Sequence, residues 1–107
     1  MAVVRFTTPT FKFTFKKVDV SDIVEADLVV KQWDNTVVEK GFSSATVDTD
    51  ENALLWTLTQ AEAGLLLTGK RYAAMCDWLT SGGTRGRSKV DEGSIENAGK
   101  NEVITHE

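Results

Sequence analysis

The sequence GLLLTGKR at residues 64 to 71 has the Gly-x-x-x-x-Gly-Lys spacing of a phosphate-binding loop. Such a loop needs a serine or threonine after the lysine to hold magnesium, but Arg71 stands in that place. It also joins a strand to a helix, so that backbone amides point at the phosphate, whereas this segment runs from a predicted helix into a predicted strand. We therefore interpret residues 64 to 71 as a structural connection and predict no nucleotide cofactor.

The remaining reactive side chains are isolated from one another. His106 is the only histidine, so neither a catalytic triad nor a histidine metal site is available to a monomer. The single cysteine, Cys76, falls on a predicted core face, where we expect a neutral, unreactive thiol. Asp48, Asp50 and Glu51 lie in a turn-like segment whose spacing matches no dedicated calcium loop. The sequence thus predicts a protein that is not an enzyme and has no catalytic residue, metal or cofactor.

Three basic side chains, Arg85, Arg87 and Lys89, alternate after a Gly-Gly pair, so all three share one face of a predicted strand. This face could meet an acidic partner surface. The same pattern is typical of a solvated edge strand whose charges prevent pairing with other chains. Both interpretations stay open on the residues alone.

The three tryptophans, Trp33, Trp56 and Trp78, would suggest a platform for stacking sugars if their rings were exposed. Parity along the predicted strands places Trp56 and Trp78 on core faces. A stand-alone carbohydrate- or receptor-binding β-sandwich is therefore an alternative function, and the exposure of the rings decides for or against it.

The net charge of −4 belongs to one end of the sequence. Residues 91 to 107 hold five acidic residues and one lysine, whereas residues 1 to 90 are neutral, which argues against a general nucleic-acid binder. The acidic segment has little to bury beyond Ile95, Val103 and Ile104. We therefore predict a β-domain over residues 1 to 90 and, over residues 91 to 107, an acidic tail that is flexible or orders on a partner.

Alternating apolar residues predict a sheet protein. In TFKFTFKK, at residues 10 to 17, every second residue is phenylalanine until the final lysines, so the rings share the core face of a strand. Strand-like runs bounded by turn signals recur at residues 2–6, 10–16, 26–33, 36–40, 44–47, 53–59, 70–80 and 87–90. Seven or eight short strands favour an all-β sandwich. Its predicted core contains Phe11, Phe13, Phe15, Leu54, Trp56, Leu58, Tyr72, Cys76 and Trp78.

One short helix interrupts the strand pattern. Thr59 and Glu62 have the spacing of a capping box, and Gly69 can supply the left-handed residue that ends a helix, so we predict a helix near residues 59 to 68.

The chain contains neither an apolar run long enough to span a membrane nor the pattern of a signal peptide. We expect it to be made and folded in a cytoplasm.

The order of these segments is similar to the immunoglobulin-like β-sandwich module of phages of Gram-positive bacteria, typified by the N-terminal domain of baseplate upper proteins. The similarity covers about residues 6 to 89. It rests on the aspartate-rich turn at 19–22, the strand pattern at 28–32, the helical turn at 58–62, the strand and glycine hairpin at 70–83, and Ser88 where the last strand begins. The resemblance implies an immunoglobulin-like antiparallel sandwich.

The resemblance also implies a function. We expect a non-enzymatic virion structural protein of a phage or prophage, made in the host cytoplasm, that docks and assembles as part of a tail, baseplate or neck. Its expected partners are other virion proteins or further copies of itself, with no nucleic acid and no membrane. Candidate contact residues are Val3, Val29, Met75, Arg85, Arg87, Lys89, Ile95, Val103 and Ile104.

Overall fold

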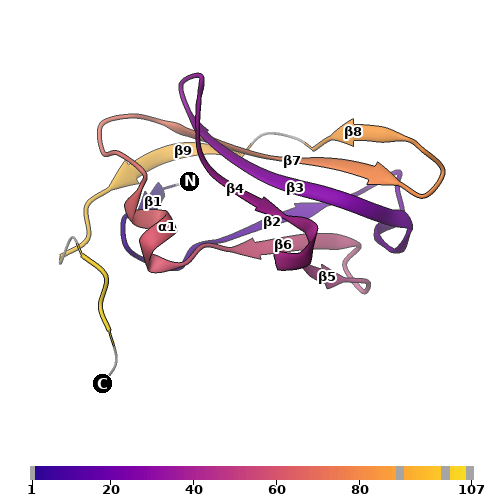
Figure 1. Ribbon diagram of the computed structural model, residues 1–107, viewed down its shortest axis with the longest axis horizontal. Coiled ribbons are helices and arrows are strands. Elements are labelled where there is room, and N and C mark those ends of the chain that lie inside the picture. The colour runs from indigo at the N-terminus through magenta and orange to yellow at the C-terminus, as the bar shows by residue number, and fades with distance from the viewer. Residues whose placement is uncertain (1, 89–90, 100–101, 106–107) are drawn as a thin grey trace.

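The computed structural model describes residues 2–88, 91–99 and 102–105, which form two β-sheets packed face to face (Figure 1). The smaller sheet has the order β2-β6-β5, with β2 at Thr10–Thr14, β5 at Thr46–Asp48 and β6 at Ala53–Thr57. The larger sheet has the order β1-β9-β7-β3-β4, and β8 also pairs with β7. Its strands are β1 (Ala2–Val4), β3 (Ile23–Gln32), β4 (Asn35–Gly41), β7 (Tyr72–Thr80), β8 (Arg85–Arg87) and β9 (Asp91–Glu96).

The strand order is that of an immunoglobulin-like sandwich. The sheet β2-β6-β5 corresponds to strands B, E and D of that fold, and β4-β3-β7-β9 corresponds to C′, C, F and G. Within the described residues, every strand pair is antiparallel except β1 with β9, which is parallel. The predicted all-β fold is confirmed, with this parallel pair as a departure from a purely antiparallel sandwich.

The aromatic face of β2 lies against the larger sheet. Phe11 meets Tyr72 edge-to-face at 5.9 Å between ring centroids, and Phe15 meets Trp78 in the same way at 5.9 Å. Phe13 makes its edge-to-face contact with Trp56 on the neighbouring strand, at 6.0 Å. Burying each large apolar side chain stabilises the fold by roughly 1.5–3 kcal/mol. The predicted core residues lie here, all buried except Trp78, which is partly buried: Phe11, Phe13, Phe15, Leu54, Trp56, Leu58, Tyr72 and Cys76.

Helix α1 covers Gln60–Gly64 and is shorter than the predicted segment from 59 to 68. Both hydrogen bonds of the capping box are present between Thr59 and Glu62. The helix stops early because the chain then turns Leu66 fully into the core. Gly69 has a φ of +78°, but in the turn before β7 rather than at the helix end. Two 3₁₀ turns complete the connections, at Val20–Asp22 and Phe42–Ser44.

The predicted domain boundary at residue 90 is wrong, because Asp91–Glu96 is β9, a strand inside the larger sheet. Gly93 and Ile95 are buried, whereas Glu92, Ser94 and Glu96, which alternate with them, are exposed. Val3 pairs with Ile95 across β1 and β9, and the two side chains are 2% and 5% exposed. Neither is free to meet a partner, so both are wrong as contact candidates. They close the sandwich instead.

Candidate docking site

The reactive side chains of the sequence do not converge in the structure. Cys76 is fully buried, and its burial raises the pKa of the thiol to about 12, with the nearby Asp77 and Asp27 charges adding to the effect. In the described residues, no group of three or more histidine, cysteine, aspartate or glutamate side chains could hold a metal ion. His106 lies outside these residues. The candidate functional features of the described residues therefore lie on the surface of the protein.

The segment with the phosphate-loop spacing packs beside the β3–β4 hairpin. The side-chain amide of Gln32 accepts from the Leu67 N–H at 2.8 Å and donates to the Leu67 carbonyl at 2.8 Å. Gln32 itself is only 4% exposed. Farther along the segment, the Lys70 ammonium lies 4.3 Å from the centre of the Trp33 ring. These contacts fix the base of the hairpin and one face of the indole.

Trp33 stands at the turn of this hairpin and is 73% exposed. Gln32 pairs with Asn35, so Trp33 and Asp34 are the two turn residues. Trp33 has a φ of +57°, a region that favours glycine and is unusual for a bulky side chain. We call Trp33 and Asp34, with the neighbouring basic residues Lys31, Lys70 and Arg71, the hairpin tip.

A shallow groove lies toward the other end of the same sheet, across β3, β7 and β8. Its volume is about 310 Å³. Asp27 and Asp77 face one another directly in the register of β3 and β7, a like-charge arrangement that is unfavourable in a sheet. Within the described residues neither carboxylate is in an ion pair. We call this surface the acidic groove; it is lined by Glu25, Ala26, Asp27, Asp77, Trp78, Leu79 and Arg85.

The basic strand β8 forms one wall of this groove. Arg85 lines it, whereas the Arg87 guanidinium reaches the Met75 sulfur at 3.9 Å. Met75 is therefore only 9% exposed, and Val29, opposite it across β3 and β7, is partly buried. Both lie on the outer face of the sheet, but neither is an open contact surface. Lys89 lies outside the described residues.

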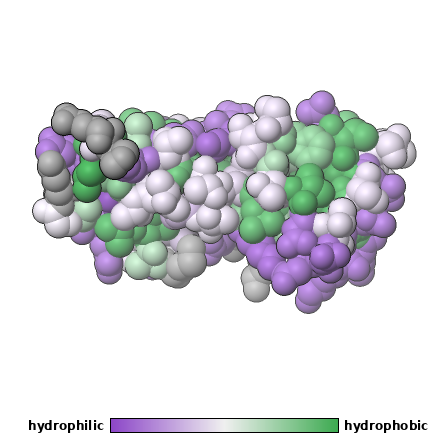
Figure 2. All heavy atoms as spheres, turned by 90° about the horizontal axis from the view of Figure 1, so that it is seen from below, coloured by the Kyte–Doolittle hydropathy of each residue, from purple (hydrophilic) through white to green (hydrophobic). Residues whose placement is uncertain are grey.

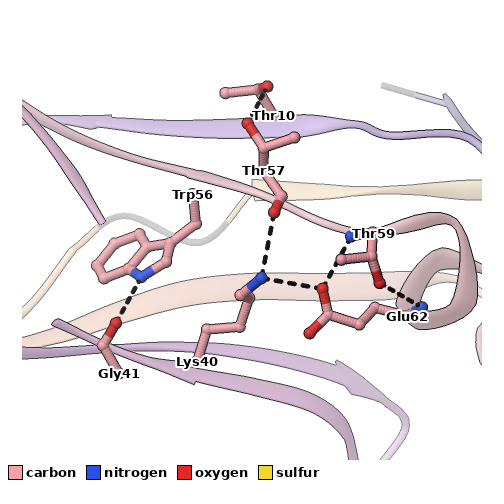
Figure 3. Close-up of polar contacts among 7 residues, drawn as sticks. All are labelled: Thr10, Lys40, Gly41, Trp56, Thr57, Thr59 and Glu62. Carbon is pink, nitrogen blue, oxygen red and sulfur yellow. Dashed lines mark hydrogen bonds and ion pairs between the residues drawn. The ribbon is translucent and has the colours of Figure 1, made fainter. Parts of the chain in front are cut away.

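A polar seam closes one side of the sandwich (Figure 3). Lys40 on β4 donates to the Thr57 carbonyl at 3.2 Å and pairs with the Glu62 carboxylate at 2.9 Å, and the Trp56 indole N–H donates to the Gly41 carbonyl at 3.0 Å. Partial burial works to raise the pKa of Glu62, but hydrogen bonds from Thr59 and the charge of Lys40 outweigh it and leave the pKa lowered. The seam ties β4 to β6 and α1, which is a structural role.

The segment at residues 102–105 is held by two hydrogen bonds to the side chain of Gln60, in the same way as Gln32 binds Leu67. The Gln60 side chain accepts from the Ile104 N–H at 2.7 Å and donates to the Ile104 carbonyl at 3.0 Å. The side chains of Val103 and Ile104 are 44% and 60% exposed. The described part of this segment is therefore attached through its backbone, and its apolar side chains remain available.

Of the three tryptophans, Trp33 alone presents an open ring. Trp56 is fully buried, and Trp78 is partly buried under Gly86 and against Phe15. A sugar platform built from two open indole rings is therefore absent from these three positions. The molecule seen from below shows hydrophobic residues in separate groups rather than one continuous face (Figure 2).

Sequence reasoning identified Trp33 but missed the acidic groove. Glu25 and Asp27 alternate with buried Ala26 and Leu28, so parity would have placed the two carboxylates on one outer face. Nothing in the sequence fixes the register that brings Asp77 opposite Asp27. The sequence therefore contained a signal for the carboxylates on β3, whereas the position of Asp77 beside them depends on tertiary strand pairing.

In the described residues, none of the helices has the length and apolar character needed to cross a bilayer. A comparison with models of known protein families found no match, and a comparison with curated protein sequences found no similar protein. The candidate site therefore rests on the geometry of the hairpin tip and the acidic groove.

Proposed function

We propose that this chain is a non-enzymatic structural protein of a phage or prophage virion, part of a tail, baseplate or neck, that works by docking onto neighbouring proteins. The resemblance of its segments to phage sandwich modules supports the virion setting. The observation that carries the docking role is Trp33, a large aromatic side chain held open to solvent on a strained turn. Tryptophan is among the residues most enriched at the energetic centres of protein interfaces.

A second feature supports docking. Exposed apolar side chains also occur near the hairpin base and α1, at Leu65 and Leu67, which are 58% and 50% exposed. They provide further apolar area beside the hairpin. A carbohydrate platform is supported less well, because sugar stacking over two rings would need Trp56 or Trp78 to be open.

The test is whether the chain is a stoichiometric part of a particle. Particles released from the bacterium that encodes the chain would be banded in a density gradient, washed at high salt and quantified by mass spectrometry. We expect the chain in a fixed ratio to the other particle proteins, above an abundant host protein that serves as the contamination control. Detection in the lysate but not in the banded particles would overturn the proposal.

A further inference from the structure

The hairpin tip contains an arrangement that is unfavourable for the isolated chain. A left-handed backbone at a bulky residue costs about 1–3 kcal/mol and persists only when the surroundings enforce it. At 73% exposure, Trp33 gains little burial energy in exchange. The two hydrogen bonds between the Gln32 side chain and the Leu67 backbone fix the base of the hairpin, and the Lys70 ammonium lies over the indole ring; together they hold the indole in this position. The chain therefore presents a preorganised aromatic side chain whose one described ring contact is with Lys70 and which buries little of its surface within the chain.

The acidic groove also contains an arrangement that is unfavourable for the isolated chain. Asp27 and Asp77 face each other without an ion pair among the described residues, and Arg87, opposite Asp77 on β8, offsets their repulsion only in part. Trp78 and Leu79 give the groove some apolar lining. A side chain with a large apolar body and cationic neighbours would relieve the repulsion and cover this apolar part of the lining.

The two surfaces are complementary in charge. The hairpin tip combines three basic residues with one acidic residue, whereas the groove lining combines three acidic residues with one basic residue. They lie at different places along β3, because Glu25 and Asp27 are in its first half and Trp33 follows its end (Figure 1). We propose that copies of this chain join head to tail, with the hairpin tip of one copy seated in the acidic groove of the next. This inference rests on the proposed assembly function and names a second copy as the partner.

Such a contact has a consequence for assembly. The tip and the groove are different surfaces, so two copies joined by a single contact leave one free tip and one free groove. The contact is therefore heterologous, and it produces a ring if the rotation between copies closes and an open chain if it does not. The smallest such ring is a two-fold dimer in which each tip fills the groove of the other copy. The bond also weakens with added salt, because charge attraction contributes to it.

The experiment measures mass by light scattering after size exclusion over a range of concentrations, at low and high salt. We expect the parent protein to form a ring or an open chain of two or more copies, and Trp33→Gly or Asp77→Lys to weaken association by roughly tenfold or more. Val47→Ala removes an exposed apolar side chain on the smaller sheet, and Asp50→Lys makes the same charge change in a distant turn. Neither control should alter association.

Mixing the two variants gives the decisive result. The Trp33→Gly protein keeps its groove and the Asp77→Lys protein keeps its tip, so together they should form a one-to-one dimer that grows no further. A mixture that stays monomeric while the parent associates would overturn the tip-to-groove contact. A parent protein that is monomeric throughout would overturn self-association, whereas the virion role is decided separately by the composition of banded particles.

Discussion

Gly86 on β8 lies directly against the indole of Trp78 on the paired strand β7. An added Cβ at residue 86 would overlap the Trp78 ring, with the Cε2 atom only 2.8 Å away. The ring is held between this glycine and Phe15, whose ring centre is 5.9 Å away. Because Trp78 is one of the residues that line the acidic groove, the absence of a side chain at Gly86 helps set the shape of that surface.

We expect Gly86→Ala to destabilise the fold by about 1–3 kcal/mol, because the methyl group displaces a packed indole. Urea unfolding followed by tryptophan fluorescence measures the change. Gly82→Ala is the matched control, since its Cβ would come no closer than 3.9 Å to the Thr80 Oγ1 atom. An unchanged midpoint for Gly86→Ala would mean that the indole can move aside freely.

Trp33→Gly should leave the protein at least as stable as the parent. Glycine adopts the positive φ of this turn readily, which offsets the loss of the Lys70 contact, itself about 0.5–1 kcal/mol at an exposed site. Thermal unfolding of Trp33→Gly and Trp33→Ala checks this, and the alanine variant should melt lower because it keeps the strain. A large fall in melting temperature for the glycine variant would assign Trp33 a structural role.

Tyr72→Phe is expected to be neutral or to stabilise the fold by about 1 kcal/mol. The Tyr72 hydroxyl is buried and has no hydrogen-bond partner among the described residues, so its removal relieves a desolvation penalty. The same burial, with the charge of Asp91 adding to it, raises the pKa of Tyr72 to about 12. The two proteins are compared by denaturant midpoints at neutral pH. A loss of more than 1 kcal/mol would show that the hydroxyl is paired in solution.

Stability should decline in acid partly through Glu62. Its pKa is lowered in the fold, because hydrogen bonds from Thr59 and the charge of Lys40 outweigh the opposing effect of burial. The stability it contributes is therefore present above the unfolded value of about 4.5 and is lost as the pH falls through the folded pKa. Glu62→Gln should be less stable than the parent at pH 7, and the difference should shrink toward pH 3.

Denaturant unfolding at a series of pH values measures this effect. Glu39→Gln is the control, because Glu39 is an exposed residue on the same strand as Lys40. A stability difference between the parent and Glu62→Gln that does not change with pH would separate Glu62 from the acid response.

The sequence predicted those parts of the fold in which local pattern and burial agree. Alternation at Phe11 and Phe13 placed the first core strand, and the capping box at Thr59 placed the helix start. β9 was not predicted because its inward positions include Gly93, which carries no hydrophobic signal, and because two of its three exposed positions are glutamates. A strand with one glycine and one isoleucine facing inward is recognisable only from the sheet that covers it.

The candidate site was predictable only in part, for a different reason. The exposure of Trp33 depends on which residues form a two-residue turn, and a one-residue shift would have turned the side chains of the following strand to the opposite face. The groove requires Asp27 and Asp77 to be neighbours across strands that are far apart in the sequence. Register is a tertiary property, so neither surface follows from local pattern alone.

The parallel pair of β1 and β9 also has a consequence for the order in which the molecule folds. Ala2 pairs with Ser94, so almost the whole described chain must be arranged before this contact can form. Contacts between residues so distant in sequence carry the largest loop-closure entropy and tend to form late. Until then, Val3 has no cover and one edge of β9 has no partner. Early in folding, these two ends of the chain are the part most exposed to pairing with the wrong molecule.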